Sequence, residues 1–413
     1  MENLKREDID GKPSVLAIIT SPLTMRYGSV LVARHSLERL AGLFEIDLVC
    51  PNGKLECGEA LTSLRSMTQV PIRKAGRLRY CWLVFLRIVG IDFPLTGQAN
   101  APMMRRAVRK KLALWNYSAI LLFDVASSQY VPTAYWKKSI VHLEDPPSIR
   151  LQRLAQLPNI SVRQKLTAVY LSIRMRAFEN KLLPHVNRSL LLSHADMDDL
   201  QKQFPNAVFA CVPYAVEVAP DNEVLSSEQR IFPMVYSGNM FHPANVDGAL
   251  FLINDIFPLI QRKHPEVRLW IVGASPDARI RQAAAKYGEA IVVTGEVESV
   301  AYYVQRACVS ICPVRLKIGV QTKVLEALMH GTPVVTTSMG NSGVGGMSGQ
   351  HLWVEDEPMA FAKRVCDLLD GKDWSEMSVA GKKFVEDGFT WEKSVSELAK
   401  QVRQVAEECV RPL

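Results

Sequence analysis

The stretch GVQTKVLEALMHGTPVVTT, residues 319–337, combines residue types that could bind a nucleotide. Its apolar residues predict a short helix after Gly319, with Lys323 and Glu326 three positions apart near the N-terminal end. A helix N-terminus presents unpaired N–H groups and a partial positive charge, both of which attract phosphate. Gly319 would let the backbone approach a ligand closely, and Lys323 would add a full positive charge beside those amides.

Two neighbouring charges extend this chemistry. Arg315, just after the preceding strand-like run, could add a second, bidentate cation, and Glu326 is an acceptor-only carboxylate suited to the hydroxyls of a ribose. A phosphate cradle and a ribose acceptor within one helical turn indicate binding of a nucleoside diphosphate. The alternative is a solvated Lys–Glu pair, which would contribute only about 0.3 kcal/mol to stability.

The composition is that of an ordinary globular chain. Its 413 residues are too many for one hydrophobic core, so two domains are expected, and 48% hydrophobic with 22% charged residues excludes a disordered or fibrous protein. The polar N-terminus predicts no signal peptide, and the apolar runs are too short to predict a membrane-spanning helix. Eight scattered cysteines without the paired spacing of a zinc site predict free thiols and a cytoplasmic location.

Strand-like runs alternate with helix-like segments in both halves of the chain. The expected strands lie at 14–23, 45–51, 117–125, 138–148, 185–192, 232–240, 267–276, 290–297, 307–314 and 332–337. The pattern is typical of an α/β protein with two doubly wound, Rossmann-like domains. We predict an N-terminal domain over 1–215, a linker over 216–232, a C-terminal domain over 233–390, and a C-terminal helix over 391–413 that could pack back on the N-terminal domain.

Two such domains facing one another would form a central cleft, and ligands of parallel sheets bind beyond the C-terminal strand ends. Polar residues and glycines follow several of the expected strands. In the N-terminal half they are Asp124, Glu144 and Asp145, and in the C-terminal half Gly238, Gly273, Gly295, Arg315, Lys323 and Glu326. We expect these residues to line one site.

Several motifs of the second half keep the order and spacing of a known family. They are YSGNMFHPANVDGALFLINDIFPLI, LWIVGASP, VVTGEVESVAYYVQRACVSICPVR, GVQTKVLEALMHGTPVVTT and FTWEKSVSELAKQV. Over roughly 230–405 the chain resembles the C-terminal domain of GT-B glycosyltransferases of the family 4 type, in the bacterial polysaccharide-pathway branch. The N-terminal half resembles that family only in outline.

The resemblance implies a retaining, metal-independent hexosyltransferase that moves a sugar from a nucleotide-sugar, UDP- or GDP-linked, to an acceptor hydroxyl. It implies no cofactor beyond this co-substrate. Glu326 would bind the ribose, and Lys323 with Arg315 the diphosphate. The implied donor-binding residues are Gly28, Gly238, His242, Gly273, Gly295, Val297, Arg315, Gly319, Lys323 and Glu326.

The sequence departs from the family at two places. The glutamate that relatives carry eight residues before Glu326, often credited with contacting the donor sugar, is Ile318 here. The Arg and Lys of a G-R-x-x-x-x-K pattern after the first strand of this domain are replaced by Asn239 and Ala244. The positive charge must then come from Lys323 and the arginine before its helix, and the sugar contact is unassigned.

An acceptor base or orienting group is expected at the N-terminal strand ends. Asp124 ranks first, because it aligns roughly with a cleft histidine of relatives, and Glu144 ranks second; these two and Glu326 are the candidate catalytic residues. Loop capping is the alternative for both N-terminal carboxylates. The stretch DMDD at 196–199 contains an Asp-x-Asp that could bind Mn²⁺, but it follows Ser193 at an expected helix start, where acids favour the helix dipole.

Basic stretches without acids mark the N-terminal half, at 71–90, 103–115 and 150–178. Interleaved aromatic and aliphatic residues fit docking to an anionic membrane face that presents a polyprenyl-linked acceptor, and a solvated helix face is the alternative. Nucleic acid is disfavoured because no nucleic-acid-binding motif is present. We therefore expect a glycosyltransferase of bacterial surface-polysaccharide or glycoconjugate assembly, cytoplasmic or peripheral at the inner face of the membrane. The alternatives are a nucleotide-sugar-binding regulatory or partner protein and a GT-B epimerase.

Overall fold

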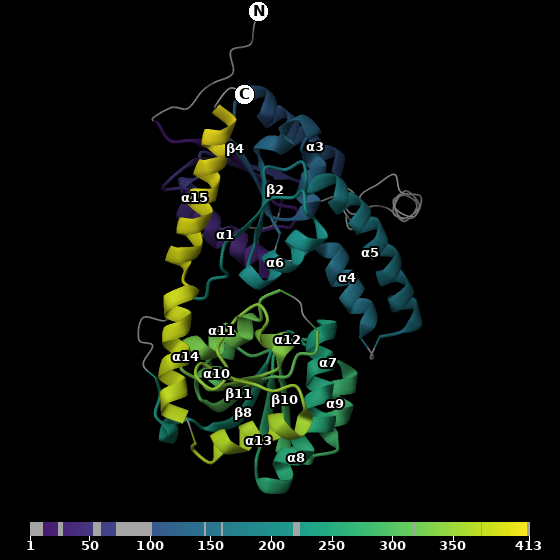
Figure 1. Ribbon diagram of the computed structural model, residues 1–413, viewed down its shortest axis with the longest axis vertical. Coiled ribbons are helices and arrows are strands. Elements are labelled where there is room, and N and C mark those ends of the chain that lie inside the picture. Colours follow the sequence, from purple (N-terminus) through teal and green to yellow (C-terminus); the bar gives the residue numbers. More distant parts are fainter. Residues whose placement is uncertain are drawn as a thin grey trace, which may run out of the picture. The chain divides into compact units, whose positions relative to one another are not determined.

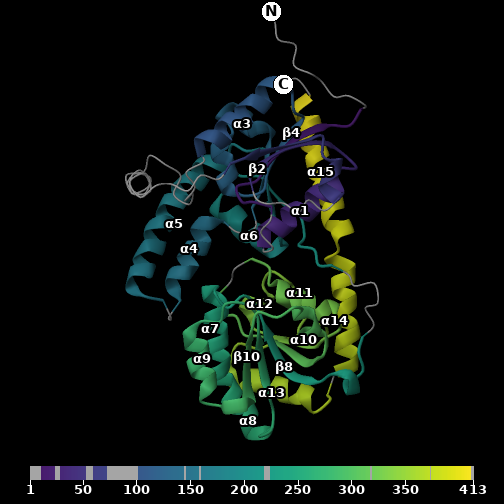
Figure 2. The same ribbon diagram turned by 180° about the vertical axis from the view of Figure 1, so that it is seen from behind.

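The computed structural model shows two α/β units (Figures 1 and 2). It describes residues 11–23, 28–52, 59–71, 101–143, 146–157, 160–217, 224–316, 319–372 and 374–410. The first unit comprises Met1–Leu151, Val169–Val212 and Ser394–Leu413, and the second comprises Gln152–Ala168 and Pro213–Lys393.

The described strands of the first unit form one parallel sheet in the order β3-β2-β1-β4-β5-β6-β7. The strands are β1 (Ser14–Ile18), β2 (Glu45–Pro51), β3 (Ser66–Val70), β4 (Ala119–Leu122), β5 (Ser139–His142), β6 (Arg188–Leu191) and β7 (Phe209–Cys211). The helices are α1 (Gly28–Leu40), η1 (Glu59–Ser63), α3 (Ala101–Leu114), η2 (Val125–Tyr130), η3 (Thr133–Lys138) and α6 (His194–Gln203). Helices α4 (Pro147–Gln156) and α5 (Val162–Leu182) are shared with the second unit, which includes the end of α4 and the start of α5. Central strands such as β1 and β4 are buried along their whole length, which explains their uninterrupted apolar runs.

The described strands of the second unit form another parallel sheet in the order β10-β9-β8-β11-β12-β13. They are β8 (Phe232–Ser237), β9 (Leu269–Val272), β10 (Ile291–Gly295), β11 (Ala307–Cys312), β12 (Val334–Thr336) and β13 (Trp353–Val354). The helices are η4 (Ser227–Gln229), α7 (Pro243–Phe251), η5 (Leu252–Ile256), α8 (Phe257–Lys263), α9 (Ala278–Ala285), η6 (Gly288–Ala290), α10 (Val300–Gln305), α11 (Thr322–Met329), α12 (Ser338–Asn341), α13 (Pro358–Leu369) and α14 (Trp374–Gly388). Helix α15 (Trp391–Val410) begins in the second unit and continues in the first from Ser394 on.

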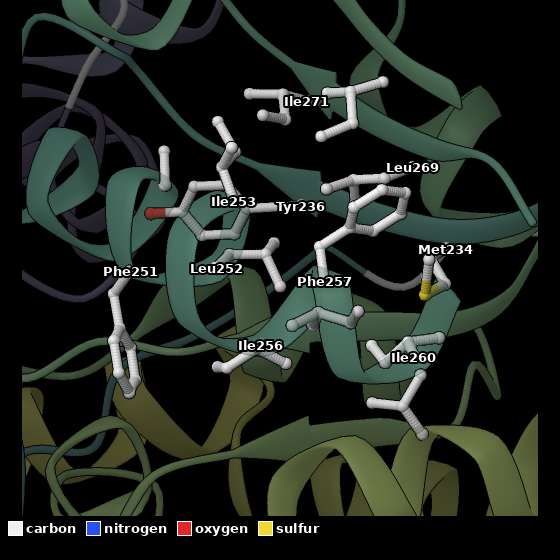
Figure 3. Packing of buried hydrophobic residues seen from close by; sticks show 14 of the residues in the cluster. Met234, Tyr236, Phe251, Leu252, Ile253, Ile256, Phe257, Ile260, Leu269 and Ile271 are labelled. Atoms are coloured by element: carbon white, nitrogen blue, oxygen red, sulfur yellow. The ribbon is translucent and has the colours of Figure 1, made fainter. Parts of the chain in front are cut away.

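The long helix expected at 247–265 contains a π-helical turn, η5, between α7 and α8. Pro258 explains it, because proline has no N–H to donate four residues back and its ring crowds the carbonyl of Asn254. The N–H of Phe257 instead bonds the carbonyl of Leu252. The helix still presents Leu252, Ile256 and Ile260 to the core, where they pack with residues of β8 and β9 (Figure 3).

The C-terminal part of α15 belongs to the first unit. There, Arg188 of β6 donates to Glu408 at 2.8 Å and to the side-chain oxygen of Gln401 at 2.7 Å. Arg188 is 5% exposed, so its ion pair and hydrogen bonds offset the cost of burying the guanidinium.

The prediction of two doubly wound α/β domains is confirmed. Each sheet has a topological switch point, where the strand order reverses direction. It lies between β1 and β4 in the first unit, and between β8 and β11 in the second. Ligands of open parallel sheets bind at such points, beyond the carboxyl ends of the strands. No described helix is long and apolar enough to cross a membrane.

Candidate functional site

Three neighbouring strands of the second unit end at glycines. Gly238 follows β8, Gly273 follows β9, and Gly295 is the last residue of β10. The N–H of Gly238 bonds the carbonyl of Val272 at 3.0 Å, and the N–H of Gly273 bonds the carbonyl of Gly295 at 3.2 Å. Gly273 has a φ of 143°, and a Cβ there would lie 1.9 Å from the carbonyl oxygen of Gly238. The backbones of these strand ends therefore pack closely, at a place that only glycine can occupy without a clash.

Lys323, in the first turn of α11, points its amine toward the end of β8. Its Nζ donates to Oδ1 of Asn245 at 2.6 Å and lies 4.9 Å from the ring centroid of Tyr236. A Cβ at Gly238 would lie 3.0 Å from the same Nζ, so the amine is next to the backbone at the β8–β11 switch point. Lys323 is 9% exposed, and its burial lowers the pKa of the amine.

Lys323 and Glu326 do not form the solvated pair that their spacing allows. In the described part of the chain, the Lys323 amine has no carboxylate within 4.0 Å, the distance limit for an ion pair. Glu326, one turn further along α11, is exposed. Protein atoms around its carboxylate raise its pKa and the charge of Lys323 lowers it; because the side chain is open to solvent, we expect this shift to be small.

Asn245 and Tyr236 hold the amine in place. The hydroxyl of Tyr236 donates to the backbone carbonyl of Asn245 at 2.9 Å, and the side-chain amide of Asn245 donates to the carbonyl of Asn239 at 2.9 Å. Tyr236 itself is fully buried in the core of the second unit (Figure 3). The site therefore contains a buried cation whose polar partner, among the residues described, is a neutral amide.

Arg315 is already paired. Its guanidinium makes a bidentate ion pair with Asp247 of α7, at 3.0 and 2.7 Å, and lies 4.5 Å from the ring centroid of Phe251. The side chain of Asp247 is 2% exposed and that of Arg315 is 38% exposed. The ion pair neutralises much of the arginine charge, so less of it is left for a diphosphate than the sequence led us to expect.

The loop before α11 is packed against the loop that follows α12. A Cβ at Gly343 would lie 2.8 Å from the carbonyl oxygen of Gly319, so the two backbones are in close contact. Gly319 has a φ of 50°, and Gln321, at the N-cap of α11, forms no side-chain capping bond. In the described part of the chain, no side chain therefore caps the first amides of α11, and these amides could bind an anion.

The other predicted donor residues surround these elements or lie elsewhere in the chain. His242 is exposed at the N-cap of α7, and Val297 is half-buried just after β10. Gly28 is the first residue of α1, in the first unit. Glu144, with its neighbour Asp145, and the departure at Ile318 lie outside the described residues.

Asp124 lies at the β1–β4 switch point of the first unit and caps η2. Its Oδ1 accepts from the N–H of Ser127 at 2.6 Å and from the hydroxyl of the same serine at 2.7 Å, and its Oδ2 accepts from the hydroxyl of Thr20. Burial raises the pKa of this carboxyl group, and the hydrogen bonds oppose that shift. Loop capping, the alternative interpretation, therefore describes what Asp124 does in this structure.

Two further titratable residues have structural roles. His142 at the end of β5 is a core residue, 3% exposed, and burial lowers its pKa to about 4. Asp196 of the DMDD stretch belongs to a capped helix start, where Ser193 donates to its carboxylate at 2.7 Å. No group of three or more His, Cys, Asp or Glu positioned to hold a metal occurs among the residues described.

Residues 232–371 match the family model "Glycosyl transferases group 1". A relative from Klebsiella pneumoniae, an uncharacterized 44.6 kDa protein in the cps region, is 25% identical over 175 residues, 41% of this chain and 45% of that protein. The match thus spans less than half the length of that curated relative.

Solved structures resemble the whole chain. Sucrose-phosphate synthase from Thermosynechococcus elongatus superposes with a TM-score of 0.71 at 15% identity, covering 96% of this chain and all of that one. HepE from Anabaena, solved in complex with UDP and glucose, superposes with a TM-score of 0.64 at 12% identity, covering 95% of this chain and all of that one. The chain therefore has the GT-B fold, and residues 232–371 of its second unit are similar to the glycosyl transferases group 1 family.

Proposed function

We propose that the protein is a retaining glycosyltransferase that moves a hexosyl group from a nucleotide-sugar to a glycan or polyprenyl-linked acceptor in bacterial surface-polysaccharide assembly. The observation that carries this proposal is Lys323, a buried cation without a carboxylate partner in the described chain, beside the glycine-bearing strand ends. Burying an ammonium group is costly unless an anion joins it, so the arrangement suits a site that binds one.

The diphosphate of the donor would lie between Lys323 and the uncapped amides of α11. When the glycosidic bond breaks, negative charge grows on the leaving diphosphate. A fixed ammonium group and backbone amides stabilise that charge more than they stabilise the intact donor, which lowers the barrier. Because these groups supply positive charge, we expect transfer to proceed without an added metal ion.

Glu326 would accept hydrogen bonds from the ribose hydroxyls. It lies one turn beyond Lys323 and is open to solvent, as a group that meets a ligand must be. Arg315 would act at the edge of the same site, held by Asp247. Asp124 remains the first candidate to orient the acceptor from the first unit, and Glu144 the second.

The comparisons support a choice of donor and of biological setting within this proposal. HepE was solved with UDP and glucose, and the Klebsiella relative is named for the cps region. We therefore expect a UDP-linked hexose ahead of a GDP-linked one.

Calorimetric titration with UDP, GDP, ADP and dTDP tests the donor site. We expect one nucleotide, UDP first, to bind, and Glu326→Ala to weaken it by about tenfold or more, because a lost hydrogen-bond pair to the ribose is worth about 1.5–3 kcal/mol. Tight UDP binding without transfer or donor hydrolysis would support the regulatory alternative. Release of free nucleotide together with an epimerised sugar, without an acceptor, would support the epimerase alternative.

A further inference from the structure

Helix α5 is buried along one face. The residues of this face recur every three or four positions and are nearly inaccessible to solvent: Ala168 at 3%, Ser172 at 5%, and Met175, Glu179 and Leu182 at 0%. Met175 and Leu182 belong to the hydrophobic core of the first unit. This face alone is sufficient to attach the helix to the protein.

The opposite face of α5 is also apolar, but it is exposed. Its members also follow helical spacing: Val162 is 73% exposed, Leu166 67%, Val169 44%, Tyr170 39% and Ile173 64%. At about 1.5 Å per residue the stripe is about 17 Å long. Neighbouring exposed aliphatic side chains in one row differ from the single exposed apolar residues that soluble proteins tolerate, and they mark an interaction surface.

Cations flank this stripe on both sides. At 100° per residue, Arg163 and Arg174 lie along one edge of it, and Lys165 and Arg176 along the other. From position 146 to 182 the sequence holds seven Lys and Arg, and its one acid is Glu179. That carboxylate is buried and accepts from the N–H of Ser148, on the side of α5 away from the stripe. The exposed surface of α5 is therefore apolar along its centre and positive along both edges.

We propose that this face of α5 docks on an anionic lipid bilayer, with the helix lying in the plane of the membrane surface. An apolar stripe between two rows of Lys and Arg is the arrangement of interfacial helices, whose apolar side chains enter the acyl boundary while the cations meet anionic headgroups. Tyr170, in the middle of the stripe, is the residue type that favours this boundary. In both views α5 lies beside α4 at the outer side of the ribbon (Figures 1 and 2).

The charge pattern favours lipid over other occupants. A second copy of the chain would bring the same cations face to face, because the contact would be isologous, and the like charges would repel. Nucleic acid would pair with the cations but would leave the aliphatic stripe in water. An anionic bilayer satisfies both parts of the surface. It would also hold the protein where a polyprenyl-linked acceptor is presented, a consequence that rests on the proposed function, whereas the docking itself does not.

Flotation of the full chain with lipid vesicles tests the proposal. The vesicles would contain about 30% phosphatidylglycerol in phosphatidylcholine, or phosphatidylcholine alone, at about 50 and 500 mM salt. We expect binding to the anionic vesicles at low salt and much weaker binding to the neutral ones. Ile173→Glu should reduce binding at least tenfold, because it places a carboxylate in the acyl boundary, and Arg163→Gln about fivefold, because it removes one cation.

Met359→Glu is the matched control, because Met359 is 76% exposed on α13 and outside the stripe. It should bind vesicles like the parent chain. Thermal melting and UDP titration of Ile173→Glu should match the parent, so a vesicle defect cannot be confused with misfolding or a failed donor site. Absence of binding to anionic vesicles at low salt, or equal binding by Ile173→Glu, would overturn the proposal. A dimer in solution that Ile173→Glu dissociates would instead identify a second copy as the occupant and overturn it too.

Discussion

The amine of Lys323 donates a hydrogen bond of 2.6 Å to the side chain of Asn245, a residue 78 positions earlier in the chain. The bond joins the first turn of α11 to the first turn of α7, next to the ends of β8 and β11. Two helix N-termini, each with a partial positive charge, therefore meet where a parallel sheet binds its ligands. A neutral partner fixes the lysine without neutralising it.

Replacing Lys323 should weaken the binding of nucleoside diphosphate without lowering the melting temperature of the protein. Lys323→Met removes the cation, so we expect nucleoside diphosphate affinity to fall about 100-fold, as for a charge-assisted contact worth about 3 kcal/mol. The same change removes a buried charge, so the melting temperature should stay equal or rise. Calorimetric titration and thermal melting of the same sample give both values. The control is Lys383→Met, at an exposed lysine of α14; equal losses in the two variants would contradict a donor role for Lys323.

A negative charge at position 245 gives a sharper test of the contact between Lys323 and Asn245. Asn245→Asp would place a carboxylate against Lys323, at the position where Oδ1 of the amide now accepts a hydrogen bond from the amine. We expect this variant to melt higher than the parent, because the buried cation gains a partner, and to bind nucleoside diphosphate at least tenfold more weakly than Asn245→Ala. The order of the two affinities is the readout, and weaker binding by the alanine variant would argue against an anion at this place.

Close packing of the strand ends predicts a large effect at one glycine. A Cβ at Gly273 would meet the backbone oxygen of Gly238 at 1.9 Å, and φ is 143°. Because neither backbone can move without breaking the sheet, we expect Gly273→Ala to lower the free energy of unfolding by about 4 kcal/mol or to prevent folding. Gly288 provides the comparison, since φ is 55° there but a Cβ would meet nothing within 4 Å. Gly288→Ala should cost only about 1 kcal/mol in urea unfolding.

The sequence was sufficient to locate most strands along the chain and the edge of each sheet where chemistry is expected, because buried parallel strands are long apolar runs. It did not predict β3, β7 or β13. It was insufficient for β3, whose stretch SMTQV is polar and half-exposed at the edge of its sheet. The direction of Lys323 was equally hidden, since a three-residue spacing fits both an outward ion pair and an inward amine. Only the packing of α11 decides between them.

The role of Arg315 shows the same limit. Its partner Asp247 lies 68 positions away, and no local pattern links the two. Sequence reasoning missed Asn245, because the G-R-x-x-x-x-K pattern of relatives points to position 244 and a single amide belongs to no recognisable motif. Tertiary contacts between helix N-termini, rather than motifs, assign both residues to the site.

Stability should fall with rising pH because of Glu179. This residue is fully buried, and its carboxylate accepts from the N–H of Ser148 at 2.9 Å and from the hydroxyl of the same serine. Burial raises its pKa from 4.5 to about 7. The folded state therefore holds the proton more tightly than the unfolded chain, so the stabilisation is complete below pH 4.5 and is lost as pH rises through about 7.

Glu179→Gln keeps the acceptor for Ser148 but cannot ionise. Between about pH 5 and pH 8, the parent should lose about 2–3 kcal/mol more unfolding free energy than this variant, from 1.36 kcal/mol per pKa unit. Urea unfolding at both pH values gives the difference, and all other titrating groups cancel in the comparison. Identical pH dependence of the two proteins would show that Glu179 ionises normally, with water reaching its carboxylate in the folded state.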